Sequence, residues 1–204
     1  MTAEELAYWY FRLNGFLTIQ NFIVHDEKKA NQRTDVDILG VRFPFRSEIG
    51  MEDDVRFTQY SAKPLYIITE VKTGLCNLNG PWTSPDKENM QRVLKSLGPL
   101  KESLIANASE LLYKQGFYED VECRVSLICV GKDENNKLEF DYPDVPQVLF
   151  KEILVFIWTR FKKFHEQKKV NQQWDKAGQD LWQCYDLNRH NKQEFVNTVL
   201  NGIG

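Results

Sequence analysis

The chain has 204 residues, a formal net charge of −3 at pH 7, 42% hydrophobic residues and a mean hydropathy of −0.48. This length and balance predict one globular domain with a real core, with or without a helical appendage, and they exclude disordered, collagen-like and coiled-coil chains. No apolar run approaches the roughly 18 residues that span a bilayer, and acidic residues stand where a secretion signal needs basic ones. We therefore expect a cytoplasmic protein without a membrane segment, and the net charge excludes a strongly cationic nucleic-acid-binding coat.

The N-terminal half is predicted to form one helix and then three strands. A helix is expected over 2–13, because Thr2 can cap it and apolar residues follow its acidic first turn at helical spacing. A polar turn over 25–33 joins the first two of three β-rich runs, which lie at 16–24, 34–41 and 64–72. An acidic insert over 43–64 is expected to hold a short hairpin or a mobile loop.

The C-terminal half is predicted to be mainly helical. Its first part predicts two helices, a strand and a further short strand, over 86–97, 100–115, 121–130 and 138–140. From Pro146 onward the pattern predicts three helices, one to about residue 169, one over 172–184 and one over 191–201. The order predicts an α/β core over 1–145 with a helical C-terminal extension over 146–204 that packs on it.

Charged residues end two of the predicted strands. Asp35 and Asp37 share one face of the second strand, and Glu70 and Lys72 share one face of the third. Burying such charges costs several kcal/mol unless they pair with one another or bind a cation. Carboxylates that converge at one end of a sheet suit Mg²⁺, and a nearby lysine can orient or help to deprotonate an attacking water. This combination is what metal-assisted phosphodiester hydrolysis needs.

These residues resemble the motif of the PD-(D/E)XK, or restriction-endonuclease-like, nuclease superfamily. The carboxylate-x-lysine of that family is similar to Glu70-Val71-Lys72, and its aspartate on the preceding strand is similar to Asp37. The motif of the family has a proline before this aspartate, and Val36 stands at that position here. The resemblance covers roughly residues 2–130, and it implies an αβββαβ core in which a mixed sheet is flanked by helices. It also implies that Asp37, Glu70 and the Val71 carbonyl hold Mg²⁺, with Mn²⁺ as a substitute.

The beginning of the chain adds to the resemblance. The run from Glu4 through Glu5 to Phe11 is similar to the opening of resolvase-like members, in which a glutamate on the first helix precedes an aromatic stripe. That register favours Glu4 over Glu5 as a further catalytic and metal-binding residue. Gln91 lies where RecB-like members carry a glutamine on the helix after the third strand, which implies a catalytic role for it as well.

Each of these residues also has a structural explanation. Asp37, Glu70 and Lys72 would form an ion-pair cluster at a sheet end, and Asp35 would be solvated or support its neighbours. Acidic residues in a first helical turn are favoured by the helix dipole in any case. A glutamine such as Gln91 is ordinary on a polar helix face.

A basic stretch with interleaved aromatic residues covers 160–169. If this stretch binds nucleic acid, four of its lysines would contact the phosphate backbone, namely Lys162, Lys163, Lys168 and Lys169. The alternative is an amphipathic helix that buries Phe161 and Phe164 and leaves the lysines in water, and we favour this alternative slightly.

Two functional hypotheses follow from the sequence. The first is a metal-dependent nuclease that hydrolyses DNA, in restriction, repair or anti-phage defence. The second is a non-catalytic DNA- or protein-binding subunit on the same scaffold. A homodimer and a larger complex with a partner subunit are both compatible with the chain.

Overall fold

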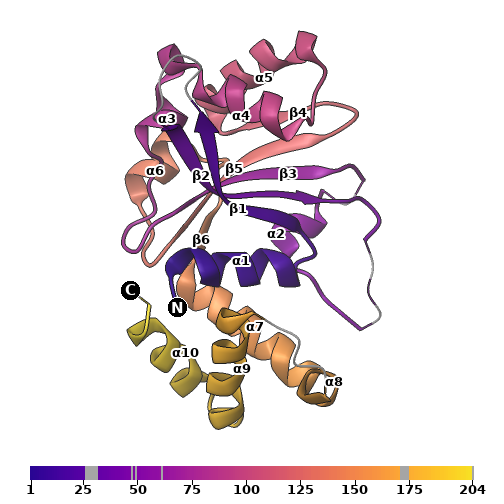
Figure 1. The fold of residues 1–204 in the computed structure, drawn as a ribbon, viewed down its shortest axis with the longest axis vertical. Coiled ribbons are helices and arrows are strands. Elements are labelled where there is room, and N and C mark those ends of the chain that lie inside the picture. Colours follow the sequence, from indigo (N-terminus) through magenta and orange to yellow (C-terminus); the bar gives the residue numbers. More distant parts are fainter. Residues whose placement is uncertain (26–31, 47, 49, 61, 171–174, 204) are drawn as a thin grey trace.

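The computed structural model describes residues 1–25, 32–46, 48, 50–60, 62–170 and 175–203. Within them the chain forms an α/β fold in which one open, mixed sheet has helices on both faces (Figure 1). The predicted α/β class with a mixed, helix-flanked sheet is therefore confirmed. Most of the polar turn predicted over 25–33 lies outside the described residues. None of the described helices combines the length and the apolar character needed to cross a lipid bilayer.

The sheet has six strands in the order β1-β2-β3-β5-β4, with β6 paired to β5. The β1–β2, β2–β3 and β4–β5 pairs are antiparallel, whereas β3–β5 and β5–β6 are parallel. The strands are β1 (Leu17–His25), β2 (Gln32–Arg42), β3 (Leu65–Val71), β4 (Phe117–Glu119), β5 (Arg124–Gly131) and β6 (Gln147–Leu149). Strand β5 is buried along its whole length, as expected for an interior strand with both faces covered.

Two groups of helices pack on the two faces of the sheet, and each group has its own apolar core. One face carries α1 (Ala3–Leu13) and α7 (Phe150–Lys163), and α9 (Lys176–Leu187) and α10 (Lys192–Asn201) pack on these two helices. The other face carries α3 (Gly80–Thr83), α4 (Asn89–Leu97), α5 (Glu102–Gln115) and α6 (Asn136–Asp141). Shorter helical segments are α2 (Val55–Thr58), a 3₁₀ turn at Pro85–Lys87, and α8 (His165–Val170).

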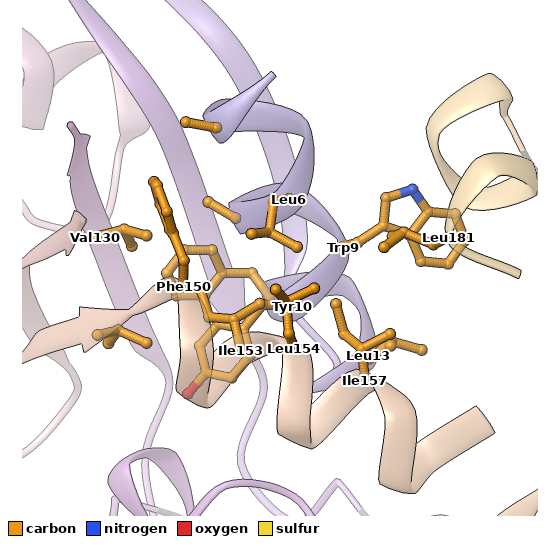
Figure 2. Close-up of a cluster of buried hydrophobic side chains, with 14 of the residues drawn as sticks. Leu6, Trp9, Tyr10, Leu13, Val130, Phe150, Ile153, Leu154, Ile157 and Leu181 are labelled. Carbon is orange, nitrogen blue, oxygen red and sulfur yellow. The ribbon is translucent and has the colours of Figure 1, made fainter. Parts of the chain in front are cut away.

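Helix α1 lies between the sheet and the C-terminal helices (Figure 1). Figure 2 shows its side chains packed against those of α7, with Leu6, Tyr10 and Leu13 close to Ile153, Leu154 and Ile157. Trp9 contacts α9, and its Nε1 donates a hydrogen bond to Asp175 Oδ1 at 3.0 Å. The segment after residue 145 therefore contributes both a strand and part of the main core.

Several predicted elements differ from the structure. The short strand predicted over 138–140 is wrong, because these residues belong to α6, whose first turn is capped by the Asn135 side chain. Strand β4 was not predicted. It is separated from β5 by a turn in which Asp120 Oδ1 accepts hydrogen bonds from the backbone N–H groups of Glu122 and Cys123. The strand predicted over 121–130 consequently begins at Arg124.

The three helices predicted after Pro146 are present, with three differences in their bounds. The helix predicted over 172–184 is α9, which runs from Lys176 to Leu187, and residues 172–174 lie outside the described residues. Strand β6 precedes the first helix, because residues 147–149 pair with β5. The long helix predicted to about residue 169 ends at Lys163, and Phe164 separates α7 from α8. The insert over 43–64 contains the short helix α2, with Asp54 as its N-cap, and no strand within its described residues.

Candidate active site

The candidate site lies where β2 separates from β3. The two strands pair from Arg42 opposite Leu65 to Ile38 opposite Thr69, and the ladder ends there. Asp37 comes next on β2, and its Oδ2 accepts a hydrogen bond from the backbone N–H of Val71 at 2.7 Å. The Asp37 carboxylate thus accepts the hydrogen bond that a backbone carbonyl of β2 would accept if the β2–β3 ladder continued. Because N–H and C=O of one extended residue point to the same side of a strand, the Val71 carbonyl also faces Asp37.

Glu70 is the most buried charge of the site, with 4% of its surface exposed. Its Oε1 accepts hydrogen bonds from Lys72 Nζ and Asn79 Nδ2, and its Oε2 accepts one from Trp82 Nε1 at 2.5 Å. Asn79 and Trp82 come from the loop after β3 and from α3. Both oxygens of the buried carboxylate therefore have donors, which is what makes its burial tolerable.

The charges of the site act on one another. Burial raises the pKa of Asp37 to about 6, although the hydrogen bond from the Val71 N–H lowers it. The negative charge of Glu70 also raises this pKa. Smaller effects come from Lys72, which lowers it, and from Glu4, which raises it. The ionised form of Asp37 is thus held in an unfavourable environment. A bound cation would stabilise that form, as expected for carboxylates at functional sites.

The structure distinguishes the two glutamates of the first helical turn. Glu5 belongs to a capping box, since its Oε2 accepts a hydrogen bond from the Thr2 backbone N–H at 2.8 Å while Thr2 Oγ1 accepts one from the Glu5 N–H. Glu4 is half-buried and its charge acts on Asp37. Its backbone carbonyl also accepts a hydrogen bond from Gln20 of β1. Glu5 is thus engaged in capping the helix, and the role of Glu4 in the site stays a prediction.

The remaining residues considered from the sequence lie apart from the group of Asp37, Glu70, Lys72 and Glu4. Asp35 is exposed. Gln91 is partly exposed on α4, and within the described residues no hydrogen bond or ion pair connects it to the charged cluster. Of the basic stretch, Lys162, Lys163 and Lys169 are exposed.

Lys168 is partly buried, and burial, with help from the positive charge of Arg160 and a smaller effect of Arg12, lowers its pKa. Arg12 lies in the last turn of α1, whereas Glu4 lies in the first, so the two are about 12 Å apart along the helix axis. The basic stretch is thus near the end of α1 opposite to the acidic cluster. Phe161 is buried and Phe164 half-buried, as the amphipathic interpretation predicts.

The donors of the cluster are suited to Mg²⁺. Within the described part of the chain, no three His, Cys, Asp or Glu side chains gather closely enough to form a metal site by themselves. Mg²⁺ does not need such a cage, since it usually binds one or two carboxylates and completes its shell with water and substrate oxygens. Asp37, Glu70 and the Val71 carbonyl form an oxygen set of this size. A cation on Glu70 would compete with Lys72 and Asn79 for Oε1.

The partners of Glu70 were not predicted from the sequence. A buried tryptophan usually finds an acceptor for its N–H, so a hydrogen bond from Trp82 to some acceptor could be expected. Nothing in the sequence indicates that this acceptor is Glu70, because the loop that brings Asn79 and Trp82 back to β3 has no recognisable pattern.

The fold and this cluster together characterise the protein. It is an α/β protein with a mixed six-stranded sheet, in which two acidic residues and a lysine meet where two strands separate. Comparisons with protein-family models, curated proteins and solved structures found no match.

Proposed function

We propose that this protein is a Mg²⁺-dependent nuclease that hydrolyses DNA phosphodiester bonds on a restriction-endonuclease-like core, with Mn²⁺ as a substitute for Mg²⁺. The element order supports this core, because α1 is followed by the antiparallel strands β1 to β3, by α4 and α5, and by β5 parallel to β3. One observation carries the activity: Asp37 meets the Glu70-Val71-Lys72 segment where β2 separates from β3.

The roles of the residues follow from their surroundings. Asp37, Glu70 and the Val71 carbonyl would hold the ion, and Glu4 would complete the site or hold a second ion. When bound, the ion supplies a Lewis acid and lowers the pKa of a coordinated water. A quarter of the Lys72 side chain is exposed, so its Nζ is able to donate to a phosphate oxygen or to orient the attacking water.

Lys72 has a different partner in the absence of substrate, since its ammonium group pairs with Glu70. Asn79 and Trp82 hold the same carboxylate and keep it oriented when Lys72 turns toward substrate. Gln91 remains a predicted catalytic residue that lies outside this cluster. The lysines at 162, 163, 168 and 169 remain predicted contacts to DNA. We further propose that the protein acts in the cytoplasm, in restriction, repair or anti-phage defence, which rests on the sequence resemblance.

The test is cleavage of plasmid and of labelled oligonucleotides in Mg²⁺ or Mn²⁺. The variants Glu70→Ala and Lys72→Ala are expected to lose cleavage by a factor of about 10² or more, because the first removes a ligand of the ion and the second removes the group that acts on the phosphate or the attacking water. Asp35→Asn is the matched control, since Asp35 is an exposed carboxylate on the same strand as Asp37. Equal cleavage by wild type and the Lys72 and Glu70 variants, or no cleavage by wild type, would contradict the proposal.

A second function is favoured by one observation. The Glu70 carboxylate already has donors on both oxygens, as expected of a structural polar network. On this alternative, the protein is a non-catalytic DNA- or protein-binding subunit on the same scaffold. Calorimetry with Mn²⁺ separates the two, because the nuclease must bind the ion and lose that binding in Asp37→Asn, whereas the subunit must not bind it.

A further inference from the structure

A second candidate site lies between the insert and α7, and it shares no lining residue with the acidic cluster. It is a cavity of about 530 Å³, one wall of which is the segment 52–54. The other wall is a stripe of α7 in which successive residues are four apart, namely Lys151, Val155, Thr159 and Lys163. Residues four apart lie on the same face of a helix, so this stripe forms one continuous side of a groove.

The middle of this groove is apolar. Val155 and Phe156 are both half-buried, and Phe156 packs edge-on against Tyr10 of α1 with ring centroids 5.4 Å apart. The volume is within the range of pockets that enclose small organic ligands, which are mostly apolar with a few polar groups that fix orientation. The groove thus offers an apolar body a place to pack.

Three of the four acidic groups of the lining are already paired, and the fourth, Glu52, is exposed to solvent and lies 3.8 Å from Lys163. Asp53 is bound by Arg42 at 2.9 Å and by Arg46, and Arg160 Nη2 lies 3.3 Å from it. Arg56 Nη1 and Nη2 contact Asp54 at 2.9 Å and Glu152 at 2.7 Å. These pairings leave the carboxylates with little capacity to attract a cationic ligand.

The cationic groups of the lining are less satisfied. Lys151 is exposed and has no ion pair within the described residues, and Lys163 has a loose one, 3.8 Å from Glu52 Oε1. The side chain of Arg160 is 3% exposed, and its Nη1 is buried without a hydrogen-bond partner, although Nη2 donates to the Glu52 carbonyl at 2.6 Å. A buried donor without an acceptor is costly, and a bound anionic oxygen is one group that removes this cost.

We propose that this groove binds a small organic anion with an apolar body, such as an aromatic carboxylate, sulfonate or phosphate ester. The body packs on Val155 and Phe156, and the anionic group lies at the end formed by Arg160 and Lys163. None of the lining residues takes part in the proposed cleavage chemistry, and the one residue shared with the nuclease proposal is Lys163, a predicted DNA contact.

The test uses two fluorescent probes that differ by one charge. The anionic probe is 8-anilinonaphthalene-1-sulfonate, and N-phenyl-1-naphthylamine is its uncharged counterpart. We expect one sulfonate site per chain and binding of the uncharged probe that is roughly tenfold weaker, which is what a hydrogen bond to a charged group contributes. Equal binding of the two probes would show an apolar pocket without anion selectivity and would overturn the proposal.

Three variants locate the site. Thr159→Trp places a large side chain at an exposed position of the groove and is expected to abolish binding. Lys163→Gln is expected to weaken it about threefold to fivefold, as for other exposed charge pairs. Lys162→Gln is the matched control on the adjacent residue, which does not line the groove, and should leave binding unchanged. Retained binding in Thr159→Trp with a native circular dichroism spectrum, or equal effects of the two lysine variants, would refute the assignment.

Discussion

Replacing Asp37 with asparagine should make the metal-free protein more stable at neutral pH. The asparagine Oδ1 still accepts the Val71 N–H, so the substitution removes the charge and keeps the hydrogen bond. In the wild-type protein the folded state raises the pKa of Asp37 from its ordinary value of 3.8 to about 6, chiefly through burial. The folded state therefore binds the proton more tightly than the unfolded state does, and ionisation of Asp37 opposes folding.

The size of the effect follows from that pKa. At about 1.4 kcal/mol per pKa unit, the rise of the pKa from 3.8 to about 6 corresponds to a loss of about 3 kcal/mol in the free energy of unfolding at pH 7.5. Asp37 is little more than half-buried, so solvent screening reduces this to about 1–2 kcal/mol. The penalty is absent below the unfolded pKa of 3.8, grows as the pH rises toward 6, and is complete above it. Asp37→Asn should therefore gain about 1–2 kcal/mol at pH 7.5 and very little at pH 4.

The assay is urea unfolding at pH 4 and pH 7.5 in the presence of a chelator, with Asp35→Asn as the control. Asp35 is exposed two residues away on the same strand, so its replacement should change the free energy of unfolding by less than about 0.5 kcal/mol at either pH. If Asp37→Asn is less stable than wild type at pH 7.5, or if its gain is the same at both pH values, the burial argument is wrong. Addition of Mn²⁺ should stabilise wild type and not the variant.

Further predictions concern the core, the site and the pH dependence of activity. Leu154→Ala should lower the free energy of unfolding by about 2–5 kcal/mol in urea titrations, because Leu154 is fully buried between α7 and α1. Gly178→Ala should cost about 1–3 kcal/mol in the same assay, since its new Cβ would lie 2.0 Å from Trp9 Cζ2 and force a shift. Trp82→Phe removes one donor from Glu70 and should cost about 1–3 kcal/mol, and a variant as stable as wild type would show that the bond is dispensable. The Mg²⁺ concentration needed for DNA cleavage should rise as the pH drops below about 6, because the ion then competes with a proton for Asp37, and a Mg²⁺ requirement that is the same at pH 5 and pH 7.5 would exclude that role.

The sequence predicts the main elements well where hydrophobic periodicity is long. Strands β1 to β3 and the helices α1, α5 and α10 lie within two residues of their predicted bounds at each end, since each has an extended apolar pattern. The three-residue strands β4 and β6 were missed because their pairing with β5 is a tertiary property. The error at 138–140 came from ignoring the N-cap at Asn135, which redirects the segment to a helix.

The candidate site was predictable in part. Alternation along β3 places Glu70 and Lys72 on one face, where they pair. Asp37 lies close to them through its hydrogen bond with the Val71 N–H, but alternation alone does not fix its side chain, because Val36 and Ile38 belong to opposite cores. The separate roles of Glu4 and Glu5 were also readable, since Thr2 followed three residues later by Glu5 is a capping-box signature. The contacts of Asn79 and Trp82 with Glu70 depend on a loop of irregular path, and local sequence carries no information on it. The buried partners of Asp53 are equally non-local, because Arg160 is more than a hundred residues away.

The position of α1 between the sheet and the C-terminal helices has a consequence for biosynthesis. Among the described elements α1 leaves the ribosome first, whereas α7, α9 and α10 follow last. Until they emerge, the apolar side of α1 that faces away from the sheet has no cover on the nascent chain, and such surfaces attract chaperones and favour aggregation. Glu4, which acts on Asp37, is part of this helix. Full packing of the helix that carries Glu4 should therefore be a late event of translation, and α1 should be less protected from hydrogen exchange in a nascent chain arrested before α7.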